Sequence, residues 1–237
     1  MIAVKFADRT VIVTGAAGNL GRAVAAAFAE RGANLVLVDL KDDALARAYG
    51  DAGGRRLFAP ANLLDAAQAE SVAQRSVERF GRIDVLANLA GGFRMGEPVH
   101  ATSAATLDFL LDLNVRTMLA MSHAAVPRML AAGRGKVVNV GAFSAQKGAA
   151  MMGAYVATKS AVIRLTEAMA AELREHGINV NCVLPTIIDT PENRAAMPDA
   201  DPSRWVAPAD LANVIAFLAS DAARAVHGAA VPVTGLS

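Results

Sequence analysis

The stretch TVIVTGAAGNLG, from Thr10 to Gly21, joins a short β-branched run to three glycines that are each separated by two residues. Good helix formers follow it as far as Gly32. This order predicts a strand, a tight turn and a helix. Residues without bulk let a backbone approach a pyrophosphate at a helix N-terminus, and Asn19 tolerates a left-handed conformation better than most residues with a Cβ. The stretch therefore predicts a dinucleotide-binding turn, although a plain tight βα turn would also fit it.

Asp39 stands at the carboxyl end of the next predicted strand, residues 34–38. It follows Gly15 by 24 residues, near the spacing of about 20 at which an acid binds the ribose hydroxyls of adenosine. Its carboxylate would repel a 2′-phosphate, and the nearby Lys41 is offset by two aspartates. We therefore expect NAD in preference to NADP. A helix N-cap is the alternative role for Asp39.

Strand and helix signals alternate along the whole chain, which predicts one domain over residues 1–237. The alternation favours a Rossmann-type α/β fold, a doubly wound parallel sheet of about seven strands with helices on both faces. A long helical region is expected to be interrupted near Asn114 and Pro127. A polar connection at about residues 186–207 is long enough to form a substrate loop. We expect the other strands at residues 10–14, 55–59, 83–87, 136–140, 178–184 and 229–234, and helices at residues 66–80, 103–132, 155–176 and 208–220.

Tyr155 and Lys159 begin the helix that follows the predicted strand at residues 136–140. Residues four apart share one face of a helix, so a phenol and an ammonium would be neighbours. A nearby cation lowers the pKa of a tyrosine from its ordinary value of about 10, and a tyrosine so tuned can exchange a proton with a substrate oxygen. The pair is short, and an incidental lysine on a solvated helix would match it equally.

The composition excludes several classes of function. A net charge of +1 with scattered basic residues gives no nucleic-acid surface, and the dispersed histidines give no metal-ligand spacing. The single cysteine suits a reducing compartment. No apolar run reaches the length of a membrane span, and the segment before the first strand is too short for a signal peptide. We expect a cytoplasmic protein that binds small molecules, with no metal, nucleic acid or membrane as its partner.

The motifs together resemble those of the short-chain dehydrogenase/reductase family, over nearly all of the 237 residues. TGAAGNLG at residues 14–21 resembles the TGxxxGxG cofactor loop of the family, NLAG at residues 88–91 resembles NNAG, and Tyr155 with Lys159 resembles YxxxK. The resemblance implies an NAD(H)-dependent oxidoreductase that transfers hydride between nicotinamide and a small carbonyl or alcohol substrate. It also implies a homotetramer.

The resemblance implies roles for the matching residues. Tyr155 would be the catalytic acid/base, Lys159 would lower its pKa and hold the nicotinamide ribose, and Asn114 would support a water-linked proton relay. The residues implied to bind the cofactor are Gly15, Asn19, Leu20, Gly21, Asp39, Asn62, Leu63, Asn88, Ala90, Gly91, Tyr155, Lys159, Pro185, Ile188 and Thr190.

Some positions depart from the family pattern, among them Asn19, Asn62, Leu89 and Thr186. The most consequential is Ala142, which stands where the family usually has its catalytic serine. Ser144 follows two residues later, and an extended backbone would point both side chains to the same side. We therefore expect Ser144, or the substrate itself, to cover the missing role.

The Gly141-Ala142 pair, the AGGF turn and the segment LPTIIDTPENRAAMPDAD also resemble the dihydropteridine reductases, so reduction of a quinonoid or imine substrate is an alternative. A dinucleotide-binding sensor without turnover is an alternative of another class. Whether the substrate is a carbonyl or alcohol, or a quinonoid or imine compound, residues after strand ends or on the polar connection would line the substrate pocket. They are Phe93, Arg94, Met95, Phe143, Gln146, Met152, Asn193, Met197 and Trp205.

Overall fold

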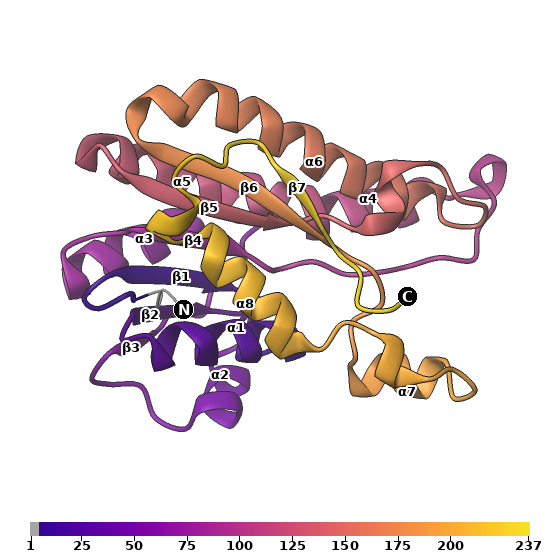
Figure 1. The fold of residues 1–237 in the computed structure, drawn as a ribbon, viewed down its shortest axis with the longest axis horizontal. Helices are drawn as coiled ribbons and strands as arrows, with labels where there is room; N and C mark the ends of the chain where they lie inside the picture. Colours follow the sequence, from indigo (N-terminus) through magenta and orange to yellow (C-terminus); the bar gives the residue numbers. More distant parts are fainter. Residues whose placement is uncertain (1–4) are drawn as a thin grey trace.

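The computed structural model describes residues 5–237, and its centre is a sheet of seven parallel strands in the order β3-β2-β1-β4-β5-β6-β7 (Figure 1). The strand order reverses between β1 and β4, where α/β sheets open a crevice at their carboxyl edge. The predicted Rossmann-type sheet is confirmed. The strands are β1 (Thr10–Thr14), β2 (Asn34–Val38), β3 (Arg56–Phe58), β4 (Val85–Asn88), β5 (Gly135–Val140), β6 (Ile178–Pro185) and β7 (Ala230–Val233).

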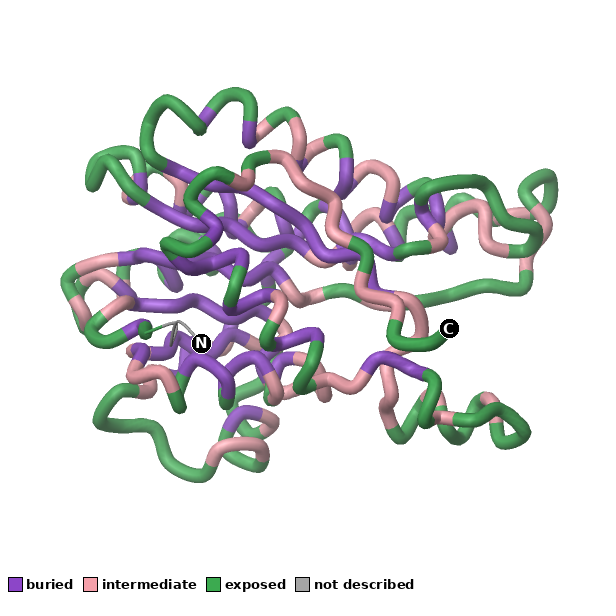
Figure 2. Tube along the Cα trace, viewed as in Figure 1, coloured by how far each residue is buried: buried purple, intermediate pink, exposed green. Residues whose placement is uncertain are grey.

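Helices cover both faces of the sheet. On one face α1 (Asn19–Glu30) packs against α8 (Pro208–Leu218), and on the other α3 (Ala66–Phe80) packs against α5 (Thr117–Ala132), with α6 (Gly153–Leu173) beside them. Figure 2 shows the buried residues following the strands through the centre of the molecule, while the loops at its periphery are exposed.

Successive residues of one strand enter opposite layers of the core. In β1, Val11 and Val13 belong to the apolar cluster beneath α1 and α8, whereas Ile12 belongs to the cluster beneath α3 and α5. The same division separates Leu37 from Val38 in β2. Both faces need apolar side chains, which is why these strands read as continuous hydrophobic runs.

Local signals set the ends of several helices. The Asp65 side chain accepts hydrogen bonds from two backbone N–H groups at the start of α3, and the Ser103 hydroxyl accepts one at the start of α4 (Ala104–Leu111). Gly81 ends α3 in the left-handed conformation, and Pro208 occupies the first turn of α8. The predicted boundaries of α3 agree with the structure.

Two helices were absent from the sequence-based prediction. They are α2 (Asp42–Tyr49), which buries Leu45 alone, and α7 (Pro191–Ala196), which buries no side chain. Both are short and polar, so they lack the apolar periodicity from which helices are predicted. The expected interruption at Asn114 is confirmed by a π-helical segment, Asp112–Arg116, but α5 continues through Pro127 unbroken.

The helix of Tyr155 also begins earlier than predicted, at Gly153, and passes into a 3₁₀ turn, Arg174–His176. Its buried face includes Ile163 and Thr166. In residues 5–237, none of the helices is apolar over a length sufficient to cross a bilayer.

The carboxylate of Asp84 ties β1 to β4 at the amino edge of the sheet. It accepts a hydrogen bond from the backbone N–H of Thr10 at 2.9 Å and pairs with Arg82. Asp84→Ala should lower the free energy of unfolding by about 1–3 kcal/mol, because a buried N–H loses its acceptor. Urea unfolding measures this change.

The matched control is Asp221→Ala, which removes an exposed partner of Arg9 and should cost at most about 1 kcal/mol. Equal losses in the two variants would contradict the role given to Asp84.

Candidate functional site

A cleft of about 680 Å³ opens at the carboxyl ends of β1, β2 and β4, at the reversal of strand order. Its walls come from the glycine turn after β1, from the segments after β2, β3 and β4, from the Asp112–Arg116 region and from α7. The predicted cofactor residues that line it are Gly15, Asn19, Leu20, Gly21, Asp39, Asn62, Leu63, Ala90, Gly91 and Thr190.

Two glycines of the turn are required by close backbone contacts. Gly15 has a φ of +62°, and a Cβ there would lie 3.1 Å from the Ala90 backbone. A Cβ on Gly21 would lie 2.2 Å from the Gly15 carbonyl oxygen, which cannot move aside as a side chain could. Gly18, the N-cap of α1, provides no side chain to cap the helix. The N-terminus of α1 therefore faces the cleft with backbone N–H donors, an arrangement that suits a phosphate group.

Asp39 is held at one end of this cleft by two backbone donors. Its carboxylate accepts hydrogen bonds from the N–H of Ala17 at 2.9 Å and from the N–H of Leu40 at 2.8 Å. The first bond joins the end of β2 to the glycine turn. Asp39 thus presents a fixed negative charge at the cleft, while neighbouring Leu40 adds an apolar wall that the sequence analysis had missed.

Asn19 connects the glycine turn to α7. Its side-chain NH₂ donates to Glu192 Oε2 at 2.7 Å, and its Oδ1 accepts from Arg22 at 2.6 Å. Asn19 and Glu192 both line the cleft, so the bond spans its rim. The side chain that replaces a glycine of the family pattern thereby holds α7 against the start of α1. Glu192 was not among the predicted residues.

Five predicted cofactor residues lie outside the lining of the cleft: Asn88, Tyr155, Lys159, Pro185 and Ile188. Asn88 is buried, and its NH₂ group donates to Asn139 Oδ1 at 2.9 Å between two central strands. Pro185 ends β6, and Ile188 forms an isolated bridge with Val206. The missed lining residues include Leu64, and Phe109 with Leu113 some 45 residues further along the chain, which the fold brings to the same cleft.

Lys159 is buried one helical turn after Tyr155 on α6. Its ammonium donates to the carbonyl oxygen of Val140, at the end of β5, at 2.8 Å. Burial lowers the pKa of Lys159 to about 8, so the side chain is still charged at neutral pH.

The pKa of Tyr155 differs from the sequence-based expectation. Burial raises it to about 12, whereas a neighbouring lysine was expected to lower it. The physical reason is that the phenol is packed between the Phe93 ring, with the ring centroids 4.8 Å apart, and the apolar cluster that contains Ala142. Withdrawal from water disfavours the phenolate, and Tyr155 is a protonated hydrogen-bond donor at neutral pH.

Asn114 lies in the π-helical segment, where its amide joins three parts of the chain. Oδ1 accepts from the N–H of Gly92 at 2.9 Å, and Nδ2 donates to the Gly92 carbonyl oxygen at 3.1 Å and to Thr158 Oγ1 at 3.3 Å. The amide therefore fixes the loop after β4 against the helix of Tyr155. Lys159 Nζ and Asn114 Oδ1 would lie 3.3 Å and 2.9 Å from a Cβ built on Gly91, so these groups converge.

Ala142 and Ser144 adopt different backbone conformations. Ala142 is extended and buried, but a 3₁₀ helix, Phe143–Gln146, begins at the next residue. The extended geometry that would align the two side chains is therefore not formed. The Ser144 hydroxyl is half-buried and has no hydrogen-bond partner among residues 5–237.

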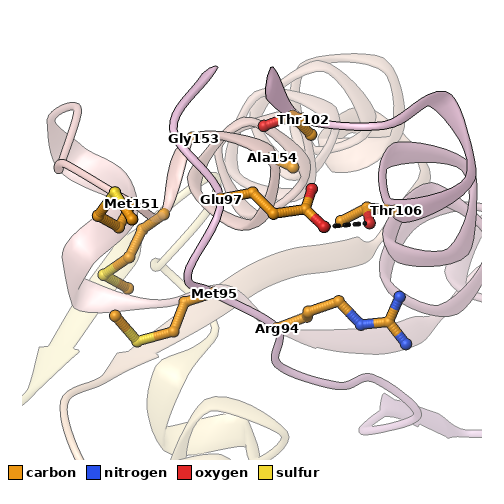
Figure 3. Close-up of a pocket in the computed structure, with 9 residues that line it drawn as sticks. Arg94, Met95, Glu97, Thr102, Thr106, Met151, Gly153 and Ala154 are labelled. Atoms are coloured by element: carbon orange, nitrogen blue, oxygen red, sulfur yellow. Dashed lines mark hydrogen bonds between the residues drawn. The ribbon is translucent and has the colours of Figure 1, made fainter. Parts of the chain in front are cut away.

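A second, smaller hollow lies between the loop after β4 and the first turn of α6 (Figure 3). Three of the predicted substrate-pocket residues, Arg94, Met95 and Met152, line it. Trp205 is buried and lines neither of these two cavities. Asn193 donates its side-chain N–H to the Ile188 carbonyl oxygen at 2.8 Å and so braces the segment that carries α7.

Comparison with known proteins gives a consistent result. A family model described as enoyl-(acyl carrier protein) reductase matches residues 15–235. A cis-4-hydroxycyclohexanecarboxylate dehydrogenase of Sinomonas cyclohexanicum is 36% identical, over 97% of this chain and 96% of that protein. A D-threitol dehydrogenase of Mycolicibacterium smegmatis is 34% identical, over 96% of this chain and 92% of that protein. The crystal structure of carveol dehydrogenase from Mycobacterium avium in complex with NAD has a TM-score of 0.89 and 28% identity, and the match covers 98% of each chain.

The close approach at Gly21 predicts that Gly21→Ala disrupts the turn. The added Cβ meets backbone atoms at 2.2–2.8 Å, so the turn and the start of α1 must separate. We expect a loss of at least tenfold in NADH affinity, measured by fluorescence titration. Gly18→Ala is the control, because its Cβ approaches no atom closer than 3.3 Å and its φ of −71° suits any residue. Equal NADH affinity in Gly21→Ala and the unmodified protein would contradict the proposed contact.

Proposed function

Since this chain belongs to the short-chain dehydrogenase/reductase family, we propose that it transfers hydride between NAD(H) and a secondary alcohol or ketone, with Tyr155 as the acid/base. The family makes the chain an oxidoreductase. The observation that carries the more specific proposal is the position of Tyr155 on α6, one helical turn before buried Lys159, whose ammonium lies close to Gly91 in the cleft wall. The alternative of a sensor without turnover lacks such support.

The chemistry of the cleft lining fits a nicotinamide dinucleotide. Gly15, Leu20 and Gly21 would receive the pyrophosphate at the start of α1, Asp39 would bind the adenosine ribose, and Lys159 the nicotinamide ribose. Asn62 and Leu63 would lie against the adenine. A bound nicotinamide ring would supply or accept the hydride, and the chain would position it. Four further residues would lie near the nicotinamide half of the cofactor: Asn88, Pro185, Ile188 and Thr190.

Tyr155 would donate its proton to the oxygen of a ketone as the hydride arrives. The charge of Lys159 would stabilise the phenolate that forms, and Asn114 would hold a water that returns the proton. The hydroxyl of Ser144 would bind the reacting oxygen only after a movement of the 3₁₀ turn. The relatives named above are dehydrogenases of alcohols, which favours a secondary alcohol or ketone over a quinonoid pterin.

Assembly and location belong to the same proposal. Leu119 and Leu130 on α5 are about 40% exposed, so this helix offers apolar surface for the contacts of a homotetramer. Light scattering would measure the number of subunits directly. The substrate loop at residues 186–207 would close over the cleft through α7. One buried cysteine suits a reducing cytoplasm.

Tyr155→Phe should lower kcat for ketone reduction at least about 10²-fold, the lower range for loss of a positioned proton donor. In the unmodified enzyme, kcat should fall as the pH rises through about 8. Lys159 loses its proton there, and with it the charge that stabilises the phenolate. Steady-state rates followed by NADH absorbance test both expectations.

Ser144→Ala is the companion variant. A loss of about tenfold would assign its hydroxyl to the reacting oxygen, and an unchanged rate would leave Tyr155 as the sole donor. Activity of Tyr155→Phe equal to that of the unmodified enzyme would refute the mechanism.

NADH should bind at least about tenfold more tightly than NADPH, a difference of about 1.4 kcal/mol, because a 2′-phosphate would meet the Asp39 carboxylate. Asp39→Ala should reduce this preference. Asp42→Ala is the control, since Asp42 is an exposed acid at the start of α2 outside the cleft lining. Equal binding of the two cofactors by the unmodified protein would contradict the assignment.

A further inference from the structure

Arg94 has a guanidinium group that is available to a ligand. Its Cζ lies 4.3 Å from the centroid of the Phe109 ring, which fixes the group without using its N–H donors. Within residues 5–237, it forms no ion pair and no hydrogen bond. By contrast, Arg116 pairs with Asp112, and Arg194 pairs with Asp189. We propose that Arg94 binds a carboxylate of the substrate, which is therefore a hydroxy acid or keto acid with an apolar body.

The location of Arg94 links it to the proposed reaction. It follows Phe93, whose ring contacts that of Tyr155, and consecutive Cα atoms are about 3.8 Å apart. It also lines the small hollow with Gly153 and Ala154, in the first turn of the helix that carries Tyr155. A substrate with its reacting carbon at Tyr155 would thus have Arg94 at its other end.

Glu97 lines the same hollow but forms no ion pair with Arg94 among the described residues. Its carboxylate accepts a hydrogen bond from the Thr106 hydroxyl at 3.0 Å and one from the N–H of Ser103 at 3.3 Å. Figure 3 shows Glu97 turned toward Thr106, with the Arg94 guanidinium apart from the Glu97 carboxylate. Among the described residues, the nearest acid in sequence is therefore committed elsewhere, and Arg94 is free for an external anion.

The surface around Arg94 would contact the apolar body of the proposed substrate. Large hydrophobic side chains are exposed around the Tyr155 edge, on the loop after β4 and before α6: Phe93, Met95, Phe143 and Met151 are 40–57% exposed. Figure 3 shows Met95 and Met151 on the side of the hollow opposite the Arg94 guanidinium. Exposed apolar groups beside one uncommitted cation match an amphiphilic acid.

This inference rests on the proposed function, so its test includes binding without turnover. Cyclohexanecarboxylate and neutral cyclohexanecarboxamide have the same ring and cannot react as alcohols. In the presence of NAD, calorimetry should show at least tenfold tighter binding of the carboxylate. Arg94→Met should abolish that difference, and Arg94→Lys, which keeps the charge but loses the planar fork, should retain part of it.

Arg174→Met is the control, because it removes one positive charge from the 3₁₀ turn at the far end of α6. It should preserve the preference for the carboxylate. Equal binding of acid and amide by the unmodified protein would overturn the proposal, as would Arg94→Met weakening both ligands alike. A weaker affinity for NAD in Arg94→Met, with the carboxylate preference intact, would assign the arginine to a cofactor phosphate instead.

A kinetic arm separates this proposal from the proposed function. The unmodified enzyme should oxidise 4-hydroxycyclohexanecarboxylate with a lower KM than its neutral carboxamide, and Arg94→Met should raise the KM of the acid at least tenfold with kcat little changed. Binding of the carboxylate without oxidation of any secondary alcohol would refute the proposed reaction and leave the anion site standing. Oxidation of acid and amide with equal KM would refute the anion site and leave the reaction standing.

Discussion

The buried ammonium of Lys159 constrains how the carboxyl edge of the sheet is built. A charge withdrawn from water needs acceptors, and the carbonyl oxygen of Val140 provides one at 2.8 Å. This contact fixes where β5 ends relative to the first turns of α6. The loop after β4 must then pass close to the same ammonium, which Gly91 allows because it has no side chain. A larger residue there would meet Lys159 and Asn114 together.

The π-helical segment around Asn114 holds the same loop. One amide satisfies both the N–H and the carbonyl group of Gly92, and also reaches Thr158 on α6. A regular helix through residues 112–116 would turn this side chain to another direction, since each residue rotates by a fixed angle. Single-turn π segments are frequent at functional sites. The widened turn therefore aligns the loop after β4 with the helix that carries Tyr155.

The parts of the molecule that are specified locally could be predicted from the sequence. Strands β1 and β2, the glycine turn and α3 follow from apolar runs, small residues and caps within a few positions. The environment of Tyr155 could not be predicted in this way, because the ring that covers it is 62 residues away, at Phe93. A spacing of four identifies neighbours on a helix, but their pKa values depend on what the tertiary fold packs around them. For the same reason the hydrogen bond from Asn88 to Asn139, 51 residues further along the chain, could not be predicted from local spacing.

Ala142 fits a site in which the substrate is oriented from its far end. The Ala142 methyl group is buried in the cluster that packs against Tyr155, so this wall offers no hydroxyl to the reacting oxygen. A substrate held only at its reacting oxygen would then lose one of its two orienting hydrogen bonds. A carboxylate paired with Arg94 and a ring against the exposed apolar residues would restrict the same rotations at a distance from the reacting carbon. Because orientation contributes to rate wherever it is imposed, a contact remote from the reaction can compensate for a missing serine.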